Sequence, residues 1–411
     1  MEIAKIHQLF LDSNGICTDT RKIKVNTLFF ALKGDNFDGN QYAQQALDNG
    51  ASYAVIDDKK VTLSKRHILV ENVLKTLQDL ASFHRKYIDI PILALTGSNG
   101  KTTTKELINQ VLSSTYKTTA TIGNLNNHIG VPLTLLSMTK DTEIGIVEMG
   151  ANHLKEIENL CNIAFPDYGY ITNIGKAHLE GFGSLEGVLK GKTELYRHLN
   201  KYDKLIFLNS EDKKLTNASE AAKTYTFSNS AKSDVMIQLE STNPMVHISY
   251  QDETIKSNLI GSYNFTNIAA AIAIGNYFKI SFENIKNAIE SYTPSNNRSQ
   301  IITKNQLTII LDAYNANPSS MHAALDNFEK LTHDSKTVFL GDMFELGDNA
   351  NIEHQGIVDS MANSSFNQIH LIGHHFYKTT IKDSRIQTYK TYDDFEQKWK
   401  QTMQLTNAVL I

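Results

Sequence analysis

The segment that most constrains this fold is residues 91–114, "PILALTGSNGKTTTKELINQVLSS". An apolar run typical of a buried strand leads into a short turn with two glycines, and a helix-forming run follows the turn. Similar apolar and helical runs alternate along most of the chain, which is the pattern of a mainly parallel sheet covered by helices. The sequence therefore predicts an α/β fold that includes this strand and helix.

The turn is a shortened phosphate-binding loop. The usual pattern G-x-x-x-x-G-K-[ST] has its first glycine where Leu95 stands here, but the residues from Gly97 to Thr102 remain. Backbone N–H groups in such a turn form a nest for anions, and the helix N-terminus adds partial positive charge. We expect Lys101 to reach the β- and γ-phosphates of a nucleotide and the Thr102 hydroxyl to bind Mg²⁺. The alternative, a plain turn with an exposed lysine, is disfavoured by the strand and the helix on either side.

Length and charge exclude several classes of protein. With 411 residues the chain is long enough for two or three domains. Its 40 basic and 44 acidic residues include no long basic run, so no nucleic-acid partner is expected. No apolar run reaches the roughly 18 residues that a membrane span needs, and no signal peptide is recognisable. Cys17 and Cys161 lack metal-ligand spacing and are interpreted as buried reduced thiols, which favours a cytoplasmic protein. A monomer is expected.

Three domains are predicted. Residues 1–88 form a small N-terminal α/β domain, residues 89–293 a central domain with the phosphate loop, and residues 294–411 a C-terminal Rossmann-like α/β domain. The expected strands are, in chain order, "TLFFAL", "YAVID", "HILV", "ILALTG", "IGIVEMG", "YGYITNIG", "KLIFLN", "LTIILDAY", "KTVFLGD", "NQIHLIG" and "NAVLI".

Polar residues follow several of these strands. Because ligands bind at the carboxyl ends of strands in an open parallel sheet, we expect Glu148, Asn173 and His178 to converge on the phosphate loop. Glu148 and His178 are candidate metal ligands there, although a single carboxylate is more often solvated or capping and a single histidine is more often packed.

Asparagines gather in two further stretches, "TIGNLNNHIGVP" and "DAYNANPSS". Asparagine suits turns, so turn formation and ligand contact both remain open for these residues. The candidates are Asn124, Asn126, Asn127, Asp312, Asn315 and Asn317. From the residues alone, the chain is interpreted as an ATP- or GTP-using Mg²⁺ enzyme with an open choice of acceptor.

Several stretches of the sequence resemble a known protein family. The loop "TGSNGKTTTKE" is similar to the ATP loop of the Mur ligases, and also to that of folylpolyglutamate synthases. The stretches "GNLNNHIGVP", "VEMGANHLKEI", "TNIGKAHLEGFGS", "DAYNANPSSM" and "GDMFELGDNANIEH" resemble the Mur ligases that add a dipeptide. This resemblance implies an ATP-dependent ligase of peptidoglycan precursor synthesis that joins D-alanyl-D-alanine to UDP-N-acetylmuramoyl-tripeptide. The alternatives are a folylpolyglutamate synthase-like ligase and a non-catalytic nucleotide-binding protein.

The resemblance also implies a role for individual residues. Lys101, His178 and Lys192 would be catalytic, and two Mg²⁺ ions would be held, one by Thr102 and Glu148 and one by His178 and a carbamylated Lys192. The implied ATP contacts are Gly97, Ser98, Asn99, Gly100, Lys101, Thr102, Thr103, Asn264, Asn267, Arg298 and Asp312. The implied contacts to the UDP-linked substrate are Thr18, Asp19, Thr20, Arg21, Lys33, Gly34, Asn124, Asn126 and Asn127, and those to the dipeptide are Tyr314, Asn315 and Asn317.

Some of these positions have a simpler interpretation or depart from the family. Without the resemblance Lys192 is interpreted as a surface lysine on a helix, and Lys190 competes with it in register. Helix capping is the alternative for Asn264 and Asn267. Asn297 stands where the family has a glycine before the arginine.

The resemblance carries two further expectations. Three substrates spread over three domains imply closure of the domains, and we expect an open form without ligands. The sequence ends at "NAVLI", where the family continues through a "KGS" turn and a final helix, and dipeptide binding is the function most exposed to that difference.

Overall fold

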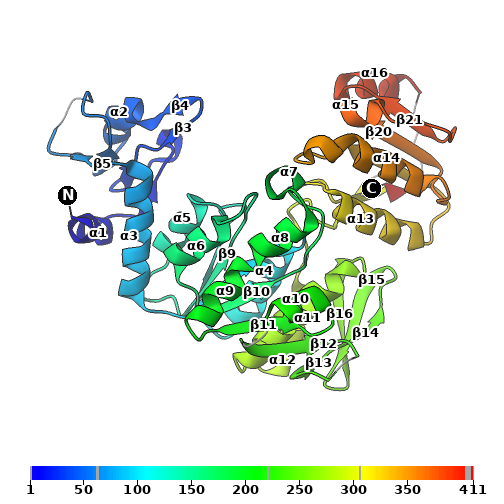
Figure 1. The fold of residues 1–411 in the computed structure, drawn as a ribbon, viewed down its shortest axis with the longest axis horizontal. Coiled ribbons are helices and arrows are strands. Elements are labelled where there is room, and N and C mark those ends of the chain that lie inside the picture. The colour runs from blue at the N-terminus through cyan, green and yellow to red at the C-terminus, as the bar shows by residue number, and fades with distance from the viewer. Residues whose placement is uncertain are drawn as a thin grey trace.

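The computed structural model describes residues 2–61, 64–219, 222–230, 232–304, 307–402 and 409–410. Three α/β units follow one another along the chain, with the central unit between the other two (Figure 1). Among the described residues no helix has the length and apolar character needed to cross a membrane.

The N-terminal unit contains a four-stranded parallel sheet of order β1-β2-β5-β6 and a short hairpin, β3-β4. All three strands predicted for this segment are present. The elements are α1 (Ile3–Leu11), β1 (Ile16–Cys17), η1 (Thr20–Lys22), β2 (Leu28–Phe30), β3 (Lys33–Gly34), β4 (Phe37–Asp38), η2 (Gly39–Tyr42), α2 (Ala43–Asp48), β5 (Tyr53–Ile56), β6 (His67–Leu69) and α3 (Val73–Ile88).

The central unit is built on a seven-stranded sheet of order β13-β12-β11-β10-β7-β9-β8 in which every pair is parallel. Its strands are β7 (Ile92–Thr96), β8 (Thr118–Ala120), β9 (Ile144–Glu148), β10 (Tyr168–Ile171), β11 (Leu205–Asn209), β12 (Lys223–Ser228) and β13 (Val235–Met236). Its helices are α4 (Lys101–Ser113), α5 (Gly130–Leu136), α6 (Glu156–Ala164), α7 (Leu179–Phe182), α8 (Leu185–Lys192), α9 (Glu194–Lys201), α10 (Lys213–Ala218), α11 (Tyr263–Tyr277) and α12 (Phe282–Ser291).

The central sheet has one hydrophobic core on each face, and the side chains of β7 contribute to both. Successive side chains of a strand point to opposite faces, so Ile92 and Ala94 pack into one core while Leu93 and Leu95 pack into the other. The second core is filled by α4 and α11. The first core continues without a break into the N-terminal unit through α3, whose Leu77 it includes.

Helix α3 belongs structurally to two units. It ends at Ile88, and Asp89 in a left-handed backbone (φ 46°) turns the chain into β7. Arg85 on its last turn donates to the carbonyl oxygens of Ala164 and Phe165 and forms an ion pair with Asp167 at 2.8 Å. The N-terminal sheet is therefore fixed to the central unit by buried polar contacts as well as by a shared core.

The sequence did not predict the three-stranded antiparallel sheet that follows β13. It consists of β14 (Gln238–Ser241), β15 (Met245–Tyr250) and β16 (Glu253–Ile260). The chain then enters α11, the helix that packs beside α4.

The C-terminal unit holds a six-stranded sheet of order β17-β18-β22-β19-β20-β21, in which only the β17-β18 pair is antiparallel among the described residues. The four predicted strands of this segment are present, and β17 and β21 are additional. The elements are β17 (Gln300–Lys304), β18 (Leu307–Leu311), α13 (Pro318–Lys330), β19 (Lys336–Gly341), η3 (Gly347–Asn349), α14 (Ala350–Met361), β20 (Gln368–Ile372), α15 (His374–Tyr377), β21 (Ile386–Tyr389), α16 (Tyr392–Thr402) and β22 (Val409–Leu410).

The two cysteines are free and come from different units. Cys161 is buried as predicted, but Cys17 is half-buried, so the expectation of two buried thiols is wrong for Cys17.

Candidate functional site

A cavity of about 1060 Å³ lies where the three units meet. The segments that follow β7, β9 and β10 line one side of it, and residues of α3 and of the start of α13 line the others. The predicted convergence of residues after these strands is confirmed, because the lining includes Glu148, Asn173 and His178. Other predicted site residues in the lining are Ser98, Asn99, Gly100, Lys101, Thr103, Asn126, Asn127, Asn264, Asn267, Arg298, Asp312, Tyr314, Asn315 and Asn317.

Both glycines of the phosphate loop are required by its shape. Gly97 has φ +145° and Gly100 has φ +77°, backbone conformations that side-chain-bearing residues rarely adopt. A Cβ on Gly97 would lie 1.9 Å from the Thr172 hydroxyl, and one on Gly100 would lie 2.7 Å from Oδ1 of Asn267. The shortened loop thus packs closely against Thr172, which follows β10, and against Asn267 of α11, and a side chain at either glycine would have to displace these residues.

Lys101 and Thr102 open helix α4 with their side chains held in the loop. Lys101 Nζ donates to the carbonyl oxygens of Gly97 (2.7 Å) and Ser98 (3.1 Å), so the ammonium already lies over the loop. Removal from bulk water lowers the pKa of Lys101, and the nearby Glu148 carboxylate opposes that shift.

Thr102 faces an acidic residue. Its hydroxyl donates to Oε2 of Glu148 at 3.0 Å, and Asn126 Nδ2 donates to Oε1 of the same carboxylate at 2.8 Å. Glu148 is 1 % exposed and ends β9. One buried carboxylate is thereby aimed at the start of the helix that follows the phosphate loop.

Asn99 joins the loop to its surroundings. Its backbone N–H donates to Oδ1 of Asn173, and its carbonyl oxygen accepts from the Thr172 hydroxyl. Its side-chain oxygen accepts from Nδ2 of Asn317 at 2.7 Å, a contact made across the unit boundary. The position of the loop is thus tied to the C-terminal unit.

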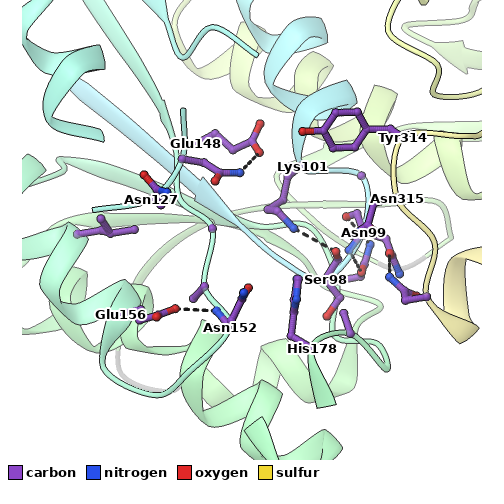
Figure 2. Close-up of a pocket in the computed structure, with 18 of the residues that line it drawn as sticks. Ser98, Asn99, Lys101, Asn127, Glu148, Asn152, Glu156, His178, Tyr314 and Asn315 are labelled. Carbon is purple, nitrogen blue, oxygen red and sulfur yellow. Dashed lines mark hydrogen bonds between the residues drawn. The ribbon is translucent and has the colours of Figure 1, made fainter. Parts of the chain in front are cut away.

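His178 lies on the opposite side of the cavity from Glu148, and its ring points toward the Lys101 side of the loop (Figure 2). Its Nδ1 is hydrogen-bonded to a carboxylate oxygen of Glu345 from the C-terminal unit. Burial lowers the pKa of the imidazole, and Glu345 opposes that shift. Glu345 was not a predicted site residue.

Lys192 is fully buried, with 0 % of its surface exposed, so the interpretation as a surface lysine is wrong. Its Nζ donates to the carbonyl oxygen of Ala151 at 2.9 Å and lies 5.2 Å from the centre of the Phe182 ring. Lys190, the competing lysine, is exposed on the same helix. Desolvation, with a smaller contribution from Lys101, places the pKa of Lys192 well below its usual range. Lys192 lies behind the Ala151 segment and outside the cavity lining.

Asn264 and Asn267 link α11 to the helix of the phosphate loop. Asn267 Nδ2 donates to Oδ1 of Asn264, and Asn267 Oδ1 accepts from the Thr104 hydroxyl at 3.0 Å. The N-cap of α11 is Ser262, and the Asn264 amide donates to the carbonyl oxygen of Ile260. Neither asparagine therefore acts as the helix cap that was the alternative interpretation.

Arg298, Tyr314 and Asp312 line the cavity from the C-terminal unit. The Arg298 guanidinium stacks 4.0 Å over the Tyr314 ring. Desolvation raises the pKa of Asp312 to about 6, against the opposing charge of Arg298. Asn297 has φ 57°, which explains physically why a glycine or an asparagine suits this position.

Two of the predicted asparagines accept hydrogen bonds from backbone N–H groups at the start of a helix. Asn317 caps α13, where its side chain accepts from the Ser320 N–H in a capping box. Asn127 accepts from the backbone N–H of Gly130 at the start of α5. Asn124 is exposed and lies outside the cavity lining.

The predicted contacts to the UDP-linked substrate that come from the N-terminal unit lie outside the cavity, whereas Asn126 and Asn127 line it. Asp19 caps the short η1 helix, and the Arg21 guanidinium lowers the pKa of its carboxyl to about 2. Thr18 and Thr20 belong to the same segment. Lys33, which precedes Gly34 on β3, forms an ion pair with Asp57 at 3.0 Å.

Two oxygen donors that suit Mg²⁺ lie together at the phosphate loop. No group of three His, Cys, Asp or Glu residues with metal-ligand geometry occurs in the described part of the chain. The Thr102 hydroxyl and the Glu148 carboxylate are two oxygen donors at the phosphate loop, and Mg²⁺ is commonly bound by one or two carboxylates together with substrate phosphates. These residues therefore fit an ion that arrives with a nucleotide.

Comparisons with known proteins agree with this geometry. Residues 12–85, 95–275 and 297–410 match the families described as Mur ligase family, catalytic domain; Mur ligase middle domain; and Mur ligase, glutamate ligase domain. The UDP-N-acetylmuramoyl-tripeptide--D-alanyl-D-alanine ligase of Bacillus subtilis is 37% identical over 342 residues, which is 82% of this chain and 74% of that protein. The protein of the same name from Escherichia coli is 31% identical over 371 residues, 88% of this chain and 81% of that protein.

The chain belongs to the Mur ligase family. Solved structures of Mur ligases superpose on nearly all of it. MurF from Acinetobacter baumannii matches with a TM-score of 0.85 and 28% identity over 98% of this chain and 94% of that one. MurF from Thermotoga maritima, solved with ADP, matches with a TM-score of 0.82 and 25% identity over 97% and 93%. A Thermotoga maritima folylpolyglutamate synthase has a TM-score of 0.57 and 12% identity over 82% of this chain and 90% of that one, which shows a shared fold alone.

This Mur ligase cavity contains residues that the sequence analysis did not single out. Phe344 and Glu345 come from the loop after β19, and Tyr263 comes from the start of α11. The stretch "GDMFELGDNANIEH" contains two of them, so its likeness to the family was the only signal for these positions.

Proposed function

We propose that this chain joins D-alanyl-D-alanine to UDP-N-acetylmuramoyl-tripeptide with conversion of ATP to ADP and phosphate. The observation that carries the proposal is the single cavity at the junction of three units, with the phosphate loop and Glu148 on its floor and Arg298 and Tyr314 on its C-terminal wall. A ligase with three substrates requires such a junction, because each unit can supply one substrate to a common point. The names of the similar ligases supply two of the substrates, the UDP-linked tripeptide and the dipeptide, and the Thermotoga maritima structure solved with ADP supports the nucleotide.

The proposed chemistry has two steps. The terminal carboxylate of the tripeptide attacks the γ-phosphorus of ATP, which gives an acyl phosphate and releases ADP. The amino group of D-alanyl-D-alanine then attacks the acyl carbon, phosphate leaves with the bonding electrons, the amine loses a proton, and an amide remains. Lys101, over the loop, neutralises charge on the transferred phosphoryl group.

In the proposal, each of the three units binds particular substrates. Residues 1–88 bind the UDP-linked peptide, residues 89–293 bind ATP, and residues 294–411 bind ATP and the dipeptide. The contacts to the UDP-linked peptide are Thr18, Asp19, Thr20, Arg21, Lys33, Gly34, Asn124, Asn126 and Asn127; those to ATP are the phosphate loop with Asn264, Asn267, Arg298 and Asp312; those to the dipeptide are Tyr314, Asn315 and Asn317.

Two Mg²⁺ ions belong to the proposal, and when bound they would supply positive charge that offsets the negative charge of the phosphates and of the attacking carboxylate. Thr102 and Glu148 are the residues for the first ion. His178 and a carbamate on Lys192 are the residues for the second. The buried amine of Lys192, with its lowered pKa, supports this modification because only a neutral amine adds to CO₂, giving R–NH–COO⁻ and a proton.

The test is phosphate release from ATP with UDP-N-acetylmuramoyl-tripeptide, with and without D-alanyl-D-alanine, for wild type, Lys192→Ala and Lys190→Ala. We expect release that requires both acceptors, that is lost in Lys192→Ala and that persists in Lys190→Ala. Lys190 is the matched control because it lies on the same helix with its side chain exposed. Release that needs neither acceptor in a folded, ATP-binding wild type contradicts the proposed function.

A further inference from the structure

The hydrogen bond between His178 and Glu345 crosses from the central unit to the C-terminal unit. His178 precedes α7, and Glu345 lies in the loop between β19 and η3. A second contact binds the same two segments, because the backbone N–H of Glu180 donates to the carbonyl oxygen of Glu345 at 3.2 Å. The carboxylate can therefore reach the imidazole only when the two units are docked.

The backbone on either side of each partner is anchored within its own unit. Ala177 and Leu179 are buried on either side of His178, and Met343 and Leu346 are buried on either side of the Phe344-Glu345 pair. In addition, the Met343 N–H donates to Nε2 of the buried His354. The contact between the two side chains therefore depends on the docking of the two units.

Both residues adopt a backbone conformation that favours glycine. The φ angle is 53° at His178 and 60° at Glu345. Such conformations cost free energy and persist where the surrounding structure imposes them, often at functional sites. Here they turn the two side chains toward each other at the edge of the cavity.

The bond determines which nitrogen of His178 faces the cavity. A carboxylate only accepts hydrogen bonds, so Nδ1 carries the proton and Nε2 keeps its lone pair in the neutral ring. An acceptor at one ring nitrogen fixes both the tautomer and the orientation of the ring, which is how the second partner of a ligating histidine acts in metal sites.

We propose that Glu345 is a positioning residue that prepares His178 when the C-terminal unit docks. Domain docking would thereby present the Nε2 lone pair to the cavity at the same time as it brings Arg298 and Tyr314 to the nucleotide. The proposal rests on the proposed function for the role of His178, but the contact itself can be tested without substrates.

Glu353 provides a matched control at the same boundary. It is also a carboxylate of the C-terminal unit, and it forms an ion pair with Lys176 of the central unit at 2.7 Å. Glu353 is absent from the cavity lining, whereas Glu345 is part of it. Loss of Glu353 therefore reports on docking alone, and loss of Glu345 reports on docking together with the imidazole.

The experiment compares Glu345→Ala, Glu345→Gln and Glu353→Ala with wild type. Nitrogen-15 NMR of the ADP-bound protein at a pH where the ring is neutral reads the His178 tautomer, with the resonance assigned from a His178→Asn variant. We expect the Nδ1–H form in wild type, in Glu353→Ala and in Glu345→Gln, whose amide oxygen still accepts. We expect a mixture of tautomers in Glu345→Ala.

Kinetics supply the second arm of the experiment. We expect kcat to fall about 10- to 100-fold in Glu345→Ala with KM for ATP little changed, and to recover most of that loss in Glu345→Gln. A wild-type tautomer in Glu345→Ala, or a kcat no lower than that of Glu353→Ala, overturns the proposal. If wild type itself shows no phosphate release with both acceptors, the proposed function fails while the tautomer comparison still decides the role of Glu345.

Discussion

The hydroxyl of Thr102 and the carboxylate of Glu148 lie 3.0 Å apart, although 46 residues separate them in the chain. They meet because β7 and β9 are neighbouring parallel strands, so the helix after one strand begins beside the last residue of the other. This meeting point is where a cation would bridge the protein and the phosphates of a nucleotide.

Replacement of Glu148 by glutamine should abolish that bridge and preserve the fold. The amide keeps the shape and the hydrogen bond from Thr102, but it removes the negative charge that attracts the ion. We expect kcat to fall by about 100-fold or more, because electrostatic stabilisation by a metal contributes several kcal/mol. Titration of Mn²⁺ into the ADP complex, followed by electron paramagnetic resonance, should show weaker binding.

A suitable control is Glu143→Gln. Glu143 immediately precedes β9, at the end of the strand opposite Glu148, and its carboxylate accepts from the exposed backbone N–H of Lys117. Equal Mn²⁺ affinity in Glu148→Gln and Glu143→Gln would contradict the assignment.

The two glycines at positions 97 and 123 should respond differently to alanine. Both have positive φ, but a Cβ on Gly97 would clash with Thr172 whereas one on Gly123 would meet nothing within 4 Å. We expect Gly97→Ala to lower the free energy of unfolding by about 2 to 5 kcal/mol, from backbone strain plus overpacking, and to abolish ATP binding.

For Gly123→Ala only the backbone strain applies, so a loss of about 1 kcal/mol with normal ATP binding is expected. Urea unfolding and calorimetric titration with ADP measure the two quantities. Comparable losses in both variants would show that the close approach to Thr172 does not matter.

Asp312 should make nucleotide binding depend on pH. Because the pKa of this carboxyl is raised to about 6, the group becomes protonated in the native protein as the pH falls below 6. A protonated carboxyl accepts hydrogen bonds from ribose hydroxyls less well, so we expect ADP affinity to fall several-fold between pH 7.5 and pH 5.5 in wild type. In Asp312→Asn the affinity should be lower at pH 7.5 and change less over this interval.

The raised pKa of Asp312 affects the stability of the fold in the opposite direction: a rise in pH favours nucleotide binding but destabilises the fold. A carboxyl whose pKa is higher in the folded than in the unfolded state stabilises the fold below its unfolded pKa and loses that contribution as the pH rises through about 6. We therefore expect Asp312→Asn to raise Tm by about 1 to 2 °C at pH 8 and to have less effect at pH 4.5. A larger gain at pH 4.5 than at pH 8 would refute the assignment.

Lys192 should carry a carbamate that Lys190 does not. In ¹³C-bicarbonate the wild-type protein is expected to show one carbamate carbon resonance, because a buried amine with a lowered pKa is available as the neutral nucleophile. The resonance should disappear in Lys192→Met, whose unbranched side chain suits the buried site, and remain in Lys190→Met. A signal that survives in Lys192→Met places the modification elsewhere.

The phosphate loop and the strands around it could be predicted because each part is local in sequence. The apolar run, the glycines and the lysine are neighbours, and strands buried on both faces appear as continuous apolar runs. The four strands predicted for the central sheet are all present, and the residues that follow β7, β9 and β10 do converge.

The hairpin of β15 and β16 has one local signal in the sequence, the alternation of apolar and polar residues from Val246 to Tyr250. Gln251 and Asp252 both have positive φ between two antiparallel strands, the geometry of a two-residue turn, and the burial of β15 alternates. The strand-and-helix alternation around this segment directed the interpretation toward parallel strands only.

Lys192 and Glu345 depend on long-range contacts that no local pattern encodes. The burial of Lys192 comes from the Ala151 segment, 41 residues away, and the position of Glu345 depends on docking against a residue 167 positions earlier. Sequence alone does not distinguish a lysine near the end of a helix from a surface residue when a segment of its own unit buries it, or a loop glutamate whose partner lies in another unit.

Helix α3 has one more consequence. Arg85 and the shared apolar core fix the N-terminal sheet to the central unit, so the distance from a uridine group in the first unit to the phosphate loop does not vary with domain docking. In the proposed binding mode the protein therefore selects substrates by the length of their peptide. A peptide one residue shorter, anchored at the same nucleotide end, would hold its carboxylate out of reach of the γ-phosphate, and the length of the peptide would be checked before any bond is made.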